Sequence, residues 1–177
     1  MFWYHIPLQT PPGIPMQDRV STRITKDLIV HWTVFVVMLG LIISIWLACK
    51  MIGNELQHPL PEAERIWRRT LFYSIAILSF PLTNLIRHIQ LRLDQTMPLP
   101  PKPTGKEARN RYLVTILVSM VIMESIGFFG LVMFKMGDNF NTLYIFTGLS
   151  LLGLVLYRPK TDEYTQIKDA LAAKLHE

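Results

Sequence analysis

Glu124 is the residue whose position most needs a chemical explanation. It lies in the stretch MESIGFFGLV (123–132), and no other charged residue lies between Arg111 and Lys135. At about 1.5 Å per helical residue, Glu124 lies roughly 20 Å from Arg111, which is near the middle of a membrane. An ionised carboxylate costs several kcal/mol at that depth. We therefore expect the carboxyl to be neutral, or hydrogen-bonded to Asn84 or to a serine or threonine of a neighbouring helix.

Histidines at the ends of two apolar stretches offer a second kind of chemistry. His31 lies near the start of the stretch 28–49, and His88 lies just after the stretch 70–86. In antiparallel helices the two imidazoles reach similar depths and can be the axial ligands of a b-type haem. Residues 30–32, VHW, resemble the start of a helix in cytochrome-b-like membrane anchors. Contacts with lipid headgroups explain both histidines without a cofactor. We therefore expect no cofactor, with b-type haem as the alternative.

Other catalytic and metal-binding patterns are missing from the sequence. The single cysteine, Cys49, excludes an internal disulfide and a cysteine-rich metal or iron–sulfur site. His5, His58 and His176 show no metal-ligand spacing. The sequence contains no G-x-S-x-G, no phosphate-binding glycine loop and no H-E-x-x-H. We therefore predict that the chain is not an enzyme and has no metal site.

Four apolar stretches predict the fold. Hydrophobic residues make up 50% of the 177 residues and charged residues 18%, below the roughly 25% of soluble domains. A helix that crosses a membrane needs about 17 to 25 mostly apolar residues. The stretches that qualify are 28–49, 70–86, 112–134 and 142–157. The sequence therefore predicts an all-α, polytopic membrane protein whose four transmembrane helices pack as two hairpins.

Basic residues predict how these helices are oriented. The net charge is +5, but no basic stripe interleaved with aromatic residues is present, so we expect the lipid bilayer and not nucleic acid as a partner. Lys and Arg concentrate in the cytoplasmic segments of membrane proteins. The two terminal segments and the middle loop hold most of them. The exceptions are Lys50, Arg65, Arg68 and Arg69 in the first outer loop and Lys135 in the second. The distribution predicts cytoplasmic N- and C-termini in a cell membrane, which we take to be a bacterial inner membrane.

The chain divides into three predicted segments: 1–27, 28–157 and 158–177. The first is a cytoplasmic arm rich in proline and aromatic residues, in which Phe2, Trp3 and Tyr4 can anchor to the membrane interface or to a partner. The second contains the four transmembrane helices. The third is an amphipathic helix on the cytoplasmic surface, with Tyr164, Ile167, Leu171 and Leu175 on one face. A Pro-rich segment, 97–104, separates the two predicted hairpins.

Small residues predict where helices approach closely. In lipid, glycine, alanine and serine allow two helix backbones to come together. One set, at intervals of four, consists of Gly40, Ser44 and Ala48. The other set, Gly127 and Gly130, lies just after Glu124. We expect these residues to pack helices within the chain, and a contact between subunits is the alternative. Pro81 removes a backbone hydrogen bond, and Thr83 and Asn84 can satisfy the freed carbonyls.

The stretch ESIGFFGLV (124–132) resembles the carboxylate helix of subunit c, the proteolipid of rotary ATPases. Glu124 sits at the position of the ion-binding carboxylate, and Gly130 and Leu131 follow as in that family. The resemblance implies that Glu124 takes up and releases a proton. It covers about nine residues, and the glycine-repeat helix that precedes the carboxylate helix in that family is missing. In its place span two reads SIAILSFPLTNLIR.

These observations lead to three hypotheses about function. The first is a non-catalytic accessory or structural subunit of a larger membrane complex, since the sequence is poor in sites and its ends are adhesive. The second is a proteolipid-like protein that handles protons through Glu124. The third is an electron-transfer membrane anchor with a b-type haem between His31 and His88.

Overall fold

The computed structural model describes residues 16–98 and 106–174, which contain five helices and no strand. The helices are α1 (Met16–Leu56), α2 (Glu62–Thr96), α3 (Glu107–Lys135), α4 (Phe140–Leu156) and α5 (Thr161–Ala173). The predicted all-α class is confirmed for these residues. Several predictions fall outside the described residues and stay predictions: those on Phe2, Trp3 and Tyr4, on Leu175 and on most of the Pro-rich segment 97–104.

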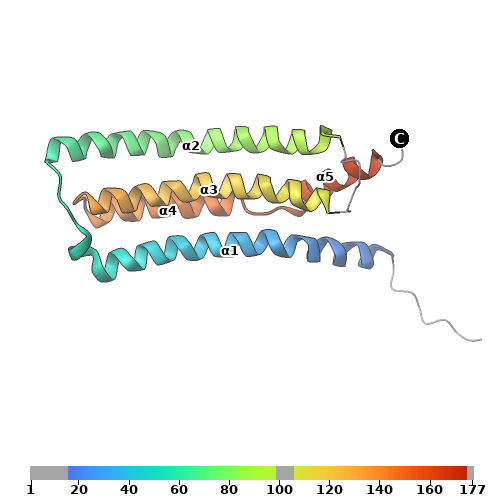
Figure 1. Ribbon diagram of the computed structural model, residues 1–177, viewed down its shortest axis with the longest axis horizontal. Coiled ribbons are helices and arrows are strands. Elements are labelled where there is room, and N and C mark those ends of the chain that lie inside the picture. Colours follow the sequence, from blue (N-terminus) through green and yellow to red (C-terminus); the bar gives the residue numbers. More distant parts are fainter. Residues whose placement is uncertain (1–15, 99–105, 175–177) are drawn as a thin grey trace, which may run out of the picture.

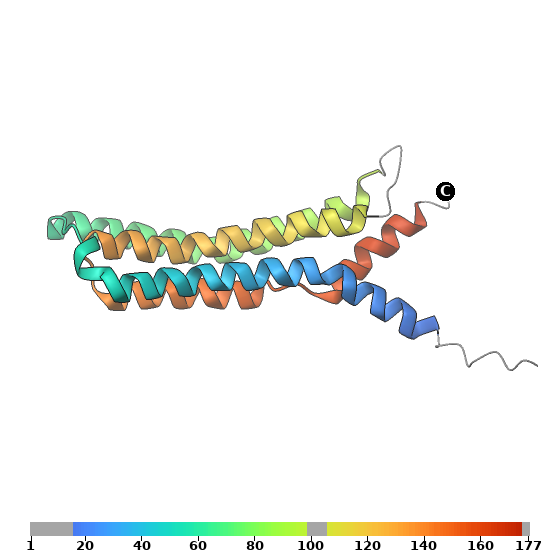
Figure 2. The same cartoon turned by 60° about the horizontal axis from the view of Figure 1, so that its bottom comes forward.

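α3 is the central helix, and each of the other helices packs against it (Figure 1). α4 runs back along α3, whereas α1 and α2 flank α3 on opposite sides. Within the described residues α1 and α2 do not pack against each other, so the predicted hairpin of the first two spans is wrong. Instead, each of these helices packs one face against a different flank of α3. Figure 2 shows α5 and the first turns of α1 at one end of the bundle.

Three helices are long and apolar enough to cross a membrane: residues Asp27–Gly53 of α1, and α2 and α3. α4 has 17 residues, and it forms a fourth candidate only together with α5, from which it is bent by 44°. The helix lengths and composition are those of a multi-pass membrane protein with three or four candidate spans. α1 begins at Met16, so its first turns lie in the segment predicted as the N-terminal arm.

α1 buries one narrow stripe of side chains against the bundle. The seven members of this stripe, which are buried or partly buried, are Leu28, His31, Phe35, Met38, Ile42, Ile45 and Cys49. Their alternating spacing of three and four residues keeps a narrow seam of one helix against its neighbours. The opposite face of α1 is exposed and apolar.

α3 and α4 approach each other through glycines. A Cβ atom added to Gly130 would lie 2.8 Å from Cβ of Phe146, and one added to Gly127 would lie 3.2 Å from Oγ of Ser150. Gly153 of α4 leaves similar room for the side chain of Met123. The Ser150 hydroxyl donates a hydrogen bond of 2.7 Å to the Met123 carbonyl across this contact. Larger side chains at the three glycines would push the two backbones apart.

At the end of the bundle opposite to α5, the α1–α2 connection lies on the α3–α4 turn. We call residues 57–61 and 136–139 together the loop clasp. The backbone N–H of His58 donates to the Lys135 carbonyl at 2.7 Å, and that of Leu60 donates to the Met136 carbonyl at 3.1 Å. Gly137 has a φ of +84°. A Cβ atom there would lie 2.7 Å from Cα of Pro59, so both the backbone conformation and the space require glycine.

We predict that Gly137→Ala lowers the free energy of unfolding by about 2 kcal/mol, because it combines a left-handed backbone with a clash against Pro59. Unfolding by sodium dodecyl sulfate in mixed micelles, followed by circular dichroism, measures the change. Gly148→Ala is the control, since a Cβ there has no atom within 4 Å. Equal stability of the two variants would contradict the role given to Gly137.

Candidate functional site

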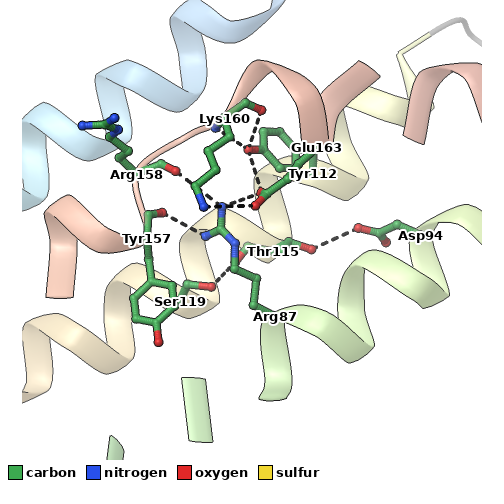
Figure 3. A network of polar contacts seen from close by, with 9 residues as sticks. All are labelled: Arg87, Asp94, Tyr112, Thr115, Ser119, Tyr157, Arg158, Lys160 and Glu163. Atoms are coloured by element: carbon green, nitrogen blue, oxygen red, sulfur yellow. Dashed lines mark hydrogen bonds and ion pairs between the residues drawn. The ribbon is translucent and has the colours of Figure 1, made fainter. Parts of the chain in front are cut away.

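A polar network joins α2, α3 and the α4–α5 turn at the α5 end of the bundle (Figure 3). Its centre is Arg87 of α2, whose side chain is 5% exposed. The guanidinium donates a hydrogen bond of 2.9 Å to the Tyr157 carbonyl and forms an ion pair of 2.6 Å with Glu163. It also donates to the Arg158 carbonyl at 3.4 Å. The cation is therefore surrounded by acceptors, as a buried charge must be.

Tyr112 of α3 is the second member of the network. Its hydroxyl accepts a hydrogen bond of 2.7 Å from the backbone N–H of Lys160. The same oxygen lies 3.2 Å from the Glu163 carboxylate and 3.0 Å from the Lys160 carbonyl. One phenol thus fixes the turn between α4 and α5 on the surface of α3.

The local sequence explains how these side chains meet. Pro159 lies in the turn after α4, where an N–H is not needed for a helix. α5 then starts at Thr161, so Glu163 lies in its first turn, where a negative charge is favourable. The apolar residues Tyr164, Ile167 and Leu171 of α5 are buried and hold the helix against the bundle. This face carries three of the four residues predicted for it.

Further contacts hold α1 and α2 to the same end. The Tyr164 hydroxyl donates to the Asp27 carboxylate at 2.9 Å, and the Thr115 hydroxyl donates to Asp94 at 3.0 Å. Four helices and the α4–α5 turn therefore meet in one polar layer.

A pocket of about 510 Å³ opens beside this network, between α2 and the α4–α5 turn. Its polar lining includes Asn84, His88 and Lys160, all of which are exposed. Its apolar lining includes Leu91 and Leu156. The pocket therefore has the two-sided character of a site for an amphiphilic molecule.

Glu124 lies away from this network, in the middle of α3. Both of its carboxylate oxygens are buried and have no hydrogen-bond partner. Asn84 is exposed on α2 at the pocket, so the predicted hydrogen bond between these two residues is not formed. No serine or threonine hydroxyl among the described residues replaces it. A buried carboxyl without partners is most stable in its neutral form.

The structure does not bring the two candidate haem ligands together. His31 is buried, with Nε2 at 3.2 Å from the Arg109 carbonyl and its ring 5.0 Å from that of Tyr112. His88 is exposed on α2, which lies on the other side of α3. Over the described part of the chain, no group of three or more His, Cys, Asp or Glu side chains could hold a metal ion.

The predicted small residues fall into two groups. Gly127 and Gly130 lie in the contact between α3 and α4. Gly40, Ser44 and Ala48 are exposed on α1, and a Cβ on Gly40 would have no atom within 4 Å. The expectation that Gly40, Ser44 and Ala48 pack helices within the chain is therefore wrong. The alternative of a contact between subunits stays a prediction.

Comparison with known proteins gives no match to a protein family, to a curated protein or to a solved structure. The resemblance of 124–132 to the ATPase proteolipid thus stays a hypothesis based on these nine residues.

The residues of the polar network were missed in the sequence, although a signal was present. Arg87 directly follows an apolar stretch, and Glu163 lies shortly after the next such stretch that ends at the same side. Opposite charges at one end of neighbouring spans can pair, and this pattern would have indicated Arg87 and Glu163. Tyr112 gave no comparable signal.

We predict that Glu163→Gln lowers the free energy of unfolding by about 3 kcal/mol, because it leaves the buried Arg87 cation without its carboxylate. Glu64→Gln is the matched control. It breaks the Glu64–Arg68 pair, whose side chains are 44% and 40% exposed, and such a pair contributes less than about 1 kcal/mol. Unfolding in mixed micelles compares the two variants, and equal losses would contradict the central role of Arg87.

Proposed function

We propose that this chain is a non-catalytic subunit of a larger membrane complex, with four membrane spans and both termini in the cytoplasm. The observation that carries the proposal is the outward stripe of α1, formed by Gly40, Ser44 and Ala48. Within the described residues, no helix of the bundle packs on this stripe. A helix of another subunit is the surface that such a stripe fits.

The physical chemistry of the stripe supports this proposal. Helices associate in lipid where small side chains let their backbones approach. A glycine inside a helix costs about 1 kcal/mol relative to alanine, and no packing within the chain offsets that cost at Gly40. The Ser44 hydroxyl donates a hydrogen bond of 2.7 Å to the Gly40 carbonyl. A partner helix that packs on the stripe therefore does not need to supply an acceptor for this hydroxyl.

The distribution of charge supports the orientation. The α5 end carries many basic residues, including Arg92, Arg111 and Lys174, and such residues favour the cytoplasmic side. At the opposite end, the arginines that opposed this orientation take part in local contacts. Arg69 pairs with Asp138 in the loop clasp, and Arg65 donates to the Gly137 carbonyl at 3.0 Å. These contacts give the two arginines a structural role on the outer side.

We predict that Gly40→Leu dissociates the complex without unfolding the chain, because the added side chain blocks the stripe and its Cβ has no atom of the bundle within 4 Å. The native mass of the protein extracted in mild detergent, with identification of co-purifying chains, measures this effect. Gly148→Leu is the matched control: a Cβ on Gly148 also has no atom within 4 Å, but it lies on α4.

The outcomes separate the possible readings. If other chains co-purify with the wild type in a fixed ratio and are lost only from Gly40→Leu, the result supports a hetero-complex. If the mass of Gly40→Leu instead falls to that of one chain from a multiple of it, the result supports a homo-oligomer. Equal behaviour of the Gly40 and Gly148 variants, or a wild-type chain that is alone in detergent, would contradict association through α1.

A second candidate function rests on Glu124. Its buried carboxylate oxygens have no partner, which is the state expected of a group that exchanges a proton inside a membrane. This candidate is compatible with a subunit role, because a proton site can belong to an assembly.

We predict that dicyclohexylcarbodiimide, which reacts with protonated carboxyls in apolar surroundings, modifies Glu124 and that the reaction slows as the pH rises. Peptide mass spectrometry identifies the modified residue, and Glu124→Gln should remove the signal. Glu64, which is exposed, serves as the internal control. Modification that is unchanged in Glu124→Gln, or a carboxyl that does not react, would rule out this second candidate.

A further inference from the structure

The pocket at the α5 end combines a positive mouth with an apolar wall. Lys160 has a side chain that is 53% exposed, and His88 and Asn84 are also exposed at the mouth. Phe80, Pro81 and Leu156, which lie deeper along α2 and α4 than His88 and Lys160, contribute apolar surface. The mouth therefore offers an ammonium group and two side chains that can donate hydrogen bonds, directly above a surface that suits hydrocarbon.

The charged residues that line the pocket leave one positive charge in excess, and Lys160 carries it. Arg87 and Glu163 neutralise each other at 2.6 Å, and both side chains are largely covered, at 5% and 17% exposed. Lys160 lies 3.8 Å from the Glu163 carboxylate, which is at the limit of an ion pair. Arg87 and Lys160 thus share one carboxylate, so the three charges sum to +1, and the exposed ammonium of Lys160 is the part of this excess that an anion from outside can reach.

The length of α4 places this mouth at the level of lipid headgroups. With 17 residues, α4 is about 26 Å long, which is shorter than the roughly 30 Å of a hydrocarbon core. The bilayer adapts to a short helix by local thinning. Headgroups beside the end of α4 then reach the residues that follow it, including Tyr157 and Lys160.

We infer that this pocket binds the phosphate headgroup of an anionic phospholipid, with an acyl chain along the apolar wall between α2 and α4. The inference rests on the proposed membrane insertion of the chain. Lys160 supplies the charge, His88 and Asn84 supply donors to the phosphate oxygens, and the Arg87–Glu163 pair holds the turn that carries Lys160.

The test uses the full chain in detergent micelles with dioleoylphosphatidylglycerol and dioleoylphosphatidylcholine, which have the same acyl chains. Native mass spectrometry counts the lipids bound to the protein. We expect a preference for phosphatidylglycerol that falls about fivefold or more in the double variant His88→Leu/Lys160→Gln, because a basic side chain near an anionic lipid contributes about that factor. Circular dichroism verifies that the variant is folded.

Two further variants keep the result interpretable. Arg92→Gln/Lys168→Gln removes two charges at the same end but outside the pocket lining, and it should keep the preference. Leu156→Trp fills the apolar wall and leaves the charges in place, and it should weaken the binding of phosphatidylglycerol.

Several results would overturn the lipid site. They are equal binding of the two lipids, an equal loss in the Arg92/Lys168 control, and displacement of the lipid by excess inorganic phosphate, which would identify a site for free phosphate. Extraction of the chain from membranes by alkaline carbonate would instead contradict membrane insertion itself. A chain that stays in the membrane and shows no lipid preference contradicts the lipid site alone.

Discussion

The close approach of α3 and α4 through Gly127, Gly130 and Gly153 is the contact on which the rest of the bundle is built. Lipid gives helices no hydrophobic reason to associate, so the fit between their surfaces must supply the energy. With α4 seated in this way, α3 keeps two free flanks, and α1 and α2 each occupy one of them. This arrangement explains why the consecutive helices α1 and α2 do not touch, and why α3 has buried residues along its whole length although its sequence shows no clear apolar face.

α2 holds α4 at both ends, although the two helices share little surface. Arg69 pairs with Asp138, whose carboxylate also accepts from the N–H of Asn139 at the start of α4. Arg87 donates to the Tyr157 and Arg158 carbonyls, which follow the end of α4. The two arginines are 18 residues apart (87 − 69), which is about 27 Å and five full turns, so they lie on one face of α2 at a spacing that matches α4. Free backbone groups at each end of α4 thus receive a charged partner.

The sequence predicts the helices themselves well, because an apolar run of this length rarely forms anything other than a helix. It predicts their ends less well, since α1 and α2 continue past the apolar runs as Met16 and Thr96 show. It does not predict which face meets which: Gly40 and Gly127 are alike as residues, yet one faces outward and the other lies against Ser150. The Arg87–Glu163 pair joins positions 76 residues apart, and only the folded arrangement of α2 and α5 brings them together. The sequence therefore singles out Glu124, which lies away from the polar network, but it does not single out Arg87, Tyr112 or Glu163.

Two features of the chain are unfavourable as long as it is considered alone. Glu124 has no partner for its buried carboxylate oxygens, and an unsatisfied buried polar group costs about 1 to 3 kcal/mol. Gly40 weakens α1 without any gain in packing. Glu124 lies one turn before Gly127, where an added Cβ would lie 3.2 Å from Ser150 of α4 and 3.6 Å from Ile42 of α1. Gly40 lies on the outward face of α1, whereas α2 is tied to the two ends of α4 by the Arg69–Asp138 and Arg87–Glu163 ion pairs. A neighbouring subunit on the outward face of α1 would make use of the stripe, whereas the carboxyl of Glu124 is buried inside the bundle, so the two proposed functions rest on different parts of the fold.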